Sequence, residues 1–187
     1  HPESMASLNG VVFFVSQRGA LGHDGLRAIE IWRRLKKTSG NAINAARVVA
    51  AFADTFPDAE IVGVDVVKQP RYPFRFEQDD AMTYPLDGFD FVWASPPCQG
   101  YSVMRNLTWL AAKEYPLLIG PIRERLIAWG GAWIIENVMG ARRQAMMDAH
   151  WLCGTMYGLP FYRHRLFQAN FLWLVPYHPP HDAVIRS

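Results

Sequence analysis

A cysteine that follows two prolines is the side chain of this sequence best suited to act as a nucleophile. Cys98 comes after Pro96 and Pro97, and this turn directly follows the apolar run at residues 89–93. Each proline fixes its own φ angle and biases the residue before it toward an extended conformation, so the thiol is presented from a stiff arm. A thiolate that attacks a carbon atom gains from being held in place beforehand. The alternative is a small buried residue in a proline turn, the commoner role of a lone cysteine.

Two further motifs follow Cys98, and together the three resemble the DNA cytosine-5 methyltransferase family. Pro-Pro-Cys-Gln ends at residue 99, Glu-Asn-Val begins at Glu136, and Arg-His-Arg begins at Arg163. The motifs stand in the family's order, and the resemblance extends from about residue 61 to about residue 171. It implies that the catalytic residues are Cys98, Glu136, Asn137, Arg163 and Arg165.

The resemblance implies covalent catalysis at C5 of cytosine. The thiolate of Cys98 adds to C6 while Glu136 neutralises the charge that develops on the ring, and C5 of the resulting enamine attacks a one-carbon electrophile. Loss of the C5 proton and then of Cys98 restores the aromatic ring. Arg165 holds O2 of the base, Arg163 holds O2 or a phosphate, and Asn137 fixes the loop that carries Glu136. Because C6 lies inside a stacked duplex, DNA must supply a flipped or single-stranded cytosine.

The family's methyl donor is S-adenosyl-L-methionine, and the resemblance places four residues around it. Trp32, at a predicted strand end, stacks on the adenine ring, and Asp65 binds the ribose hydroxyls. Asp80 contacts the adenine amino group, with Asp79 as the neighbouring alternative, and Pro96 completes the set. An aspartate at a strand end also commonly caps a turn, which is the alternative role for Asp65.

The segment after Trp32 departs from the family pattern. The family has a glycine-rich turn there, whereas this chain has Arg-Arg-Leu-Lys-Lys-Thr at residues 33–38. Glycines let a backbone approach its ligand closely, and larger side chains fill that space. We therefore expect weak or absent binding of S-adenosyl-L-methionine, and a second donor such as methylenetetrahydrofolate is an alternative. A third reading is a non-catalytic homologue that binds DNA or a partner methyltransferase, and RNA as the substrate also stays open.

The order of apolar and helical stretches predicts an α/β fold with a doubly wound, mostly parallel sheet, the Rossmann-like methyltransferase fold. The site is then expected at the carboxyl ends of the strands. Strands are predicted near residues 26–32, 60–67, 88–94 and 131–135, with an added strand at residues 11–15. The other expectations are a helix at residues 42–52, a proline-rich loop at 68–76, a mobile loop at 101–106, and helical stretches between 107 and 129 broken at Tyr115-Pro116 and near Gly120-Pro121.

A chain of 187 residues, half of them hydrophobic, is long enough for one core and short for two. We expect an N-terminal extension at residues 1–25, whose residues 1–4 are interpreted as a tag remnant, a catalytic domain at 26–175 and a tail at 176–187. The stretch after Phe171 is too short for a target-recognition domain. A protein partner or an oligomer is therefore expected to supply target recognition.

The net charge is only +2, so a DNA-binding surface must come from local basic clusters. Each of them is otherwise a solvated helix face. The candidates are Arg33-Arg34 with Lys36-Lys37, Arg123 with Arg125, Arg142-Arg143, and Arg163 with Arg165.

Two cysteines in the whole chain argue against a disulfide scaffold and favour a reducing cytoplasm. The resemblance implies a compact phage-type or restriction-modification enzyme, and therefore the cytoplasm of a bacterium or of a phage-infected host. The six histidines show no paired Cys/His spacing. His178 and His181 are interpreted as loop residues and Cys153 as a core residue, so no metal site is expected. No apolar run approaches the roughly 20 residues of a membrane span, so no membrane association is expected.

Overall fold

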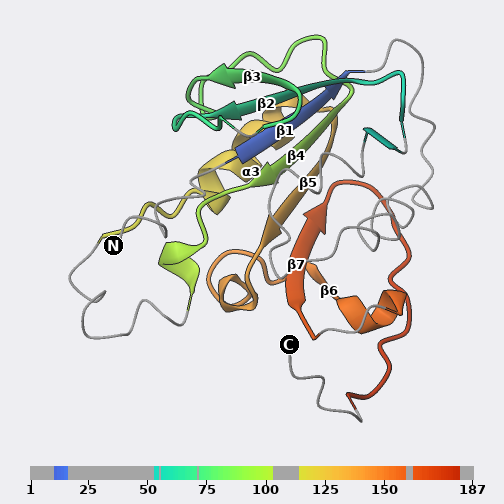
Figure 1. Cartoon of the computed structure of the whole chain (residues 1–187). Coiled ribbons are helices and arrows are strands. Elements are labelled where there is room, and N and C mark those ends of the chain that lie inside the picture. Colours follow the sequence, from blue (N-terminus) through green and yellow to red (C-terminus); the bar gives the residue numbers. More distant parts are fainter. Residues whose placement is uncertain are drawn as a thin grey trace.

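The computed structural model describes residues 11–16, 53–54, 56–70, 72–102, 114–158 and 162–181. Within these residues one seven-stranded sheet has the strand order β3-β2-β1-β4-β5-β7-β6 (Figure 1). The strands are β1 (Val11–Ser16), β2 (Glu60–Asp65), β3 (Arg75–Gln78), β4 (Phe91–Ser95), β5 (Ala132–Asn137), β6 (His150–Cys153) and β7 (His164–Ala169). The helices are α3 (Ile119–Trp129) and the short 3-10 helices η3 (Gln99–Tyr101), η5 (Met139–Ala141) and η6 (Gly154–Tyr157). None of the helices in these residues is long and apolar enough to cross a membrane.

Most strands of the sheet point the same way. β2 pairs with β3 in parallel, and so does β4 with β5. β1 is antiparallel to both β2 and β4, and β7 is antiparallel to both β5 and β6. The strands β2 to β6 therefore share one direction, and β1 and β7 oppose it. The residues that follow β4, end β5 and β6, and begin β7 consequently meet at one edge of the sheet.

Four predicted strands correspond to observed ones. The added strand at 11–15 is β1, and the runs at 60–67, 88–94 and 131–135 are β2, β4 and β5. The predicted strand at 26–32 and the predicted helix at 42–52 lie outside the described residues. The place between β2 and β4 is taken by β1, which the sequence predicted only as an added strand. The pairing in the described sheet is mixed, and the doubly wound, mostly parallel arrangement stays a prediction.

Three other strands lie where the sequence predicted none. β3 lies partly within the expected proline-rich loop, and β6 and β7 lie in stretches interpreted only as motifs. All three are short or half-exposed, so their own apolar patterns are weak. β3 pairs with β2, β7 pairs with β5, and β6 pairs with β7. These pairings make the three segments strands, which a single segment does not reveal.

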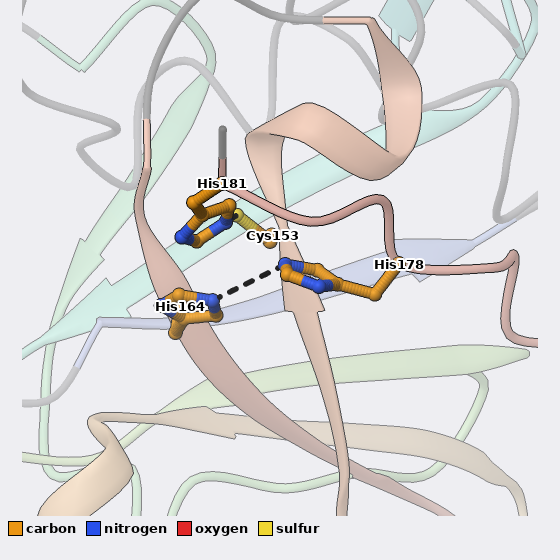
Figure 2. A group of neighbouring side chains, drawn as sticks. All are labelled: Cys153, His164, His178 and His181. Carbon is orange, nitrogen blue, oxygen red and sulfur yellow. Dashed lines mark hydrogen bonds between the residues drawn. The ribbon is translucent and has the colours of Figure 1, made fainter. Parts of the chain in front are cut away.

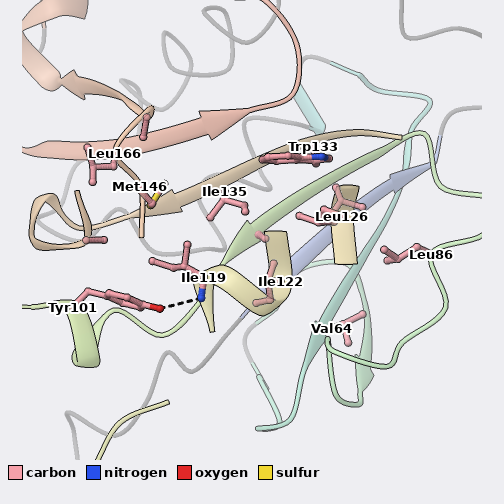
Figure 3. Close-up of a cluster of buried hydrophobic side chains, with 14 of the residues drawn as sticks. Val64, Leu86, Tyr101, Ile119, Ile122, Leu126, Trp133, Ile135, Met146 and Leu166 are labelled. Atoms are coloured by element: carbon pink, nitrogen blue, oxygen red, sulfur yellow. Dashed lines mark hydrogen bonds between the residues drawn. The ribbon is translucent and has the colours of Figure 1, made fainter. Parts of the chain in front are cut away.

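Apolar side chains cover both faces of the sheet, which explains why β2 and β4 are nearly continuous buried runs. On one face, Val64, Trp133 and Ile135 pack against α3, whose buried side chains are Ile119, Ile122 and Leu126 (Figure 3). On the other face the buried cluster includes Phe56, Ile61, Phe91, Trp93, Ile134, Leu152, Phe167 and Trp173. The C-terminal segment therefore contributes to the core through Trp173.

The helix α3 begins at Ile119, so the boundary predicted near Gly120-Pro121 corresponds to the start of the helix. Pro121 lies in the first turn, where a backbone N–H has no partner within the helix and its absence costs nothing. The helix ends at Gly130, which has a φ of 80° and donates its N–H to the carbonyl of Leu126 at 3.2 Å. A left-handed glycine at this position is the usual end of a helix.

Tyr101, the first residue of the mobile loop expected at residues 101–106, is buried and hydrogen-bonded within the fold. The expected mobility is therefore corrected at this residue. The side chain is 3% exposed, and its hydroxyl oxygen accepts a hydrogen bond from the backbone N–H of Ile119 at 3.1 Å (Figure 3). The turn after Cys98 is therefore attached to the start of α3. Residues 103–106 of the predicted loop lie outside the described part of the chain.

Arg123 and Arg125 brace α3 against the loops beside it. Arg123 donates to the carbonyl of Ala145 at 2.5 Å, and Arg125 donates to the carbonyls of Ala81, at 2.6 Å, and Tyr84. Buried or half-buried backbone carbonyls need such partners. This predicted basic cluster is therefore an internal part of the fold.

Candidate active site

The edge of the sheet at the carboxyl ends of β4 and β5 gathers all five predicted catalytic residues. Cys98 follows β4, Glu136 and Asn137 end β5, and the Arg-His-Arg motif begins β7. Glu136 and Asn137 thus belong to the strand, whereas the sequence placed them after it. Because β5 is parallel to β4 and antiparallel to β7, these positions are neighbours in space (Figure 1).

Glu136 and Arg165 form an ion pair across β5 and β7. Nε of Arg165 lies 3.1 Å from Oε1 of Glu136, and the side chains are 24% and 23% exposed. The register pairs Glu136 with Phe167, so the side chains of residues 136, 165 and 167 share one face of the sheet. Burial raises the pKa of Glu136, while Arg165, a hydrogen bond from Ser95 and the charge of Arg163 act against this rise. Its carboxyl group is therefore suited to hold or share a proton.

Ser95 is a site residue that the sequence analysis missed. Its hydroxyl is hydrogen-bonded to Glu136, and its oxygen accepts the indole N–H of Trp93 at 3.0 Å. Because the indole is a donor only, the hydroxyl hydrogen of Ser95 is left for the carboxylate. In the sequence, the hint to this residue is its position directly before the two prolines that precede Cys98. Its role depends on the pairing of β4 with β5, which places it beside Glu136.

The thiol of Cys98 is exposed to solvent on one side and surrounded by charges on the other. Burial by the neighbouring protein atoms raises its pKa, and Glu136 raises it further. Arg165, the backbone N–H of Cys98 and Arg163 lower it, but the pKa stays above the ordinary value. The surroundings of Cys98 therefore favour the protonated form of its thiol.

Arg163 adds a second guanidinium group to this edge. Burial lowers its pKa, the charge of Arg165 lowers it further, and Glu136 and Cys98 act in the opposite direction. The charges of Arg163 and Arg165 both act on Cys98 and on Glu136. Guanidinium groups bind ligands that present carbonyl or phosphate oxygens.

Asn137 connects the end of β5 to the arm that carries Cys98. Its side chain is 1% exposed, Nδ2 donates to the carbonyl of Pro96 at 2.9 Å, and Oδ1 accepts the N–H of Val138 at 2.9 Å. Glu136 and Cys98 are thus held by one buried amide. Pro96, predicted as a cofactor-binding residue, is buried and uses its carbonyl in this bond.

We expect Asn137→Ala to lower the free energy of unfolding by about 1–3 kcal/mol, because the buried carbonyl of Pro96 loses its donor. Urea denaturation of the variant and the parent measures this difference. Gln144→Ala, at an exposed position, is the matched control and should change stability by no more than about 0.5 kcal/mol. Equal stability of Asn137→Ala and the parent would show that the bond does not hold the arm.

Asp65 lies at the end of β2 as predicted, but its carboxylate is used inside the fold. The residue is 1% exposed, and its two oxygens accept the N–H of Val67 at 2.9 Å and the side-chain amide of Gln69 at 3.1 Å. Burial raises its pKa, and these two hydrogen bonds act against the rise. The geometry favours the alternative role of Asp65, the cap of a turn.

Asp79 and Asp80 lie beside the end of β2, because the N–H of Asp79 donates to the carbonyl of Asp65 at 3.2 Å. Asp80 is exposed, and its carboxylate accepts the N–H of Met82 at 2.8 Å. Asp79 accepts the N–H of Asp80 at 2.7 Å. Trp32 and the loop at 33–40 lie outside the described residues. Of the predicted cofactor contacts at strand ends and loops, the structure therefore describes the aspartates Asp65, Asp79 and Asp80 but not Trp32.

Comparisons of this chain with protein-family models, with curated proteins and with solved structures found no match. The function is therefore argued from the geometry of the site and from the motifs of the sequence.

Proposed function

We propose that this chain modifies C5 of cytosine in DNA by covalent catalysis through Cys98, as a DNA cytosine-5 methyltransferase. The observation that carries the proposal is the meeting of Cys98, Glu136 and Arg165 at one edge of the sheet. The charges of Glu136 and Arg165 both act on the thiol, and the two residues form an ion pair with each other. A nucleophile, a carboxyl group with a raised pKa and a guanidinium group are the set that addition to a pyrimidine ring requires.

Each side chain has one task in the proposed reaction. The sulfur of Cys98 forms a bond to C6 after its proton leaves, and Glu136 shares a proton with N3 of the ring. Arg165 binds O2 of the base, and Arg163 binds O2 or a phosphate. C5 of the enamine then bonds to the one-carbon electrophile, and the carrier of that carbon leaves with the electrons of the broken bond. The C5 proton is lost to solvent, the C5=C6 double bond re-forms, and the C6–S bond breaks to release Cys98 as a thiolate. Ser95 and Asn137 position Glu136 and the cysteine arm through the hydrogen bonds described above.

A second donor is the alternative within this proposal. The enamine accepts any suitable one-carbon electrophile, including a folate-borne methylene group such as that of methylenetetrahydrofolate. The observation that favours this alternative over S-adenosyl-L-methionine is the engagement of the Asp65 carboxylate by Val67 and Gln69, which removes a binder of ribose hydroxyls. The charged stretch at residues 33–38, in place of a glycine-rich turn, points the same way.

DNA is the proposed partner, with the cytosine flipped out or single-stranded. The cations that we propose for phosphate contacts are the exposed Arg142 and Arg143, together with Arg163 at the site. We assign target recognition to a protein partner or an oligomer.

Trapping on DNA that contains 5-fluorocytosine tests the proposal. Fluorine at C5 blocks the final elimination, so a covalent complex is expected only when a competent donor is present. Trapping with S-adenosyl-L-methionine supports the methyltransferase, and trapping only with methylenetetrahydrofolate supports the alternative donor. Cys98→Ser is the control and should trap nothing.

No trapping with either donor, on single-stranded or duplex DNA, would contradict the enzymatic proposal. That result would favour the non-catalytic homologue that binds DNA or a partner. The same assay on RNA with 5-fluorocytosine decides between the two nucleic acids, because the preferred substrate gives the faster covalent capture.

A further inference from the structure

A second group of reactive side chains lies apart from the ion pair of Glu136 and Arg165. Cys153, His164, His178 and His181 each point one sulfur or nitrogen atom toward a common centre (Figure 2). These four atoms all lie within 4.8 Å of one another. Cys153 is buried, His164 and His178 are half-buried, and His181 is exposed.

The fold assembles this group from three segments. Cys153 ends β6 and is paired directly with His164 at the start of β7, so their side chains share one face of the sheet. His178 and His181 come from the C-terminal segment. The ring of Trp151 contacts both His164 and His178, with centroids 5.2 and 4.7 Å away, which seats that segment against β6 and β7.

Two distances between ligand atoms match the edges of a tetrahedral metal site. With a zinc–sulfur distance of about 2.3 Å and zinc–nitrogen distances of about 2.0–2.1 Å, the edges of a tetrahedron are about 3.6 Å for S···N and about 3.3 Å for N···N. Sγ of Cys153 lies 3.5 Å from Nε2 of His181. Nε2 of His164 lies 3.4 Å from Nε2 of His178. Both pairs match the edges of such a site.

We propose that Cys153, His164, His178 and His181 bind one zinc ion. Thiolate and imidazole are the ligands that zinc prefers, and a set of four protein ligands leaves no open position for water or substrate. The ion therefore has a structural role. It ties the C-terminal segment to β6 and β7, and it fixes the backbone at His164, between the two arginines of the candidate active site.

Neighbouring side chains orient the ligands as in known metal sites. The hydroxyl of Thr155 donates to Sγ of Cys153 at 3.3 Å, which stabilises a thiolate. The ring of Tyr162 stacks on His181 with centroids 3.9 Å apart.

No metal site was expected from the sequence, because the histidines and cysteines show no paired Cys/His spacing along the chain. His178 and His181 have two residues between them, but their partners Cys153 and His164 are distant in sequence. The pairing of β6 with β7 supplies these two. The proposal does not depend on the chemistry at Cys98.

Metal analysis of the purified full chain tests the zinc site. We expect about one zinc ion per chain, and replacement by Co²⁺ should give visible absorption bands and a near-ultraviolet thiolate-to-cobalt band. Cys153→Ser should remove the thiolate band. His181→Gln, at an exposed position, should keep the fold by circular dichroism and lower zinc affinity by about 100-fold or more. His150→Gln, an exposed histidine outside the group, is the matched control and should bind as the parent does.

Thermal unfolding supplies a second measurement. Zinc at 100 times its dissociation constant should raise the melting temperature of the parent and of His150→Gln by about 5–10 °C, but not that of His181→Gln. A parent chain that binds neither zinc nor cobalt would overturn the proposal. So would a cobalt spectrum and zinc affinity that stay unchanged in both Cys153→Ser and His181→Gln. The first result would leave the group as two hydrogen-bonded pairs, and the second would place the metal elsewhere.

Discussion

Replacing Glu136 with glutamine is expected to slow covalent capture of 5-fluorocytosine DNA by about 10²–10⁴-fold, the usual loss when a general acid or base is removed. The same change is expected to make Cys98 more reactive toward iodoacetamide. The negative charge of Glu136 raises the pKa of Cys98, so its removal lowers that pKa and increases the thiolate fraction at a given pH. The two reactivities of Cys98 should therefore change in opposite directions.

The pH dependence of alkylation measures the second effect. In the parent chain the midpoint should lie above 9.0, the ordinary pKa of this thiol, and in Glu136→Gln it should move down. Glu124→Gln, at an exposed position of α3, is the matched control and should change neither alkylation nor capture. If Glu136→Gln left both rates as in the parent, Glu136 would not act on Cys98 and the proposed site would lose its acid.

Gly140→Ala is expected to destabilise the chain by about 3 kcal/mol and to disturb the cysteine loop. A Cβ atom at Gly140 would overlap the carbonyl oxygen of Tyr101 and lie 3.2 Å from its carbonyl carbon. Both contacts are with backbone, which cannot turn aside as a side chain does. Tyr101 ends η3, which directly follows Cys98, and its hydroxyl accepts a hydrogen bond from the backbone N–H of Ile119. A shift of the Tyr101 backbone is therefore expected to displace the turn that carries Cys98.

Urea denaturation and capture of 5-fluorocytosine DNA together measure the effect of Gly140→Ala. Ala128→Gly, at an exposed position of α3, is the control. It should destabilise the chain by no more than about 1 kcal/mol, since glycine loses more backbone entropy than alanine in a helix. Equal stability of the two variants would show that η5 does not press on the Tyr101 backbone.

The central strands were predictable because their signal is local. β2, β4 and β5 are apolar runs bounded by polar or glycine residues, and such runs identify buried strands without knowledge of their partners. The motif residues were also recognised from short stretches of sequence, because each motif is a local pattern. Cys98 and Glu136 lie at the carboxyl ends of the parallel strands β4 and β5, and the antiparallel pairing of β7 with β5 brings Arg165 to the same edge of the sheet.

Other features depended on contacts between distant segments. The carboxylate of Asp65 could have faced a ligand, and only the packed turn shows that Val67 and Gln69 use it. Ser95 is hydrogen-bonded to Glu136 on the neighbouring strand. Arg123 and Arg125 donate hydrogen bonds to backbone carbonyls of other loops. The type of a side chain limits which hydrogen bonds are possible for it, but the neighbouring groups in the fold decide which of these hydrogen bonds are formed.

The sequence by itself indicated the candidate nucleophile Cys98 with its proline arm, the candidate acid Glu136, the arginine pair, and the strands β2, β4 and β5, because each of these is a feature of a short stretch of chain. The tertiary structure alone decided the strand order, with β1 between β2 and β4, the ion pair of Glu136 with Arg165, and the meeting of Cys153 with three histidines. The physical reason is register. Which residues of two strands face each other depends on the burial of both and on the loops between them, and a one-residue shift would turn every side chain to the other face.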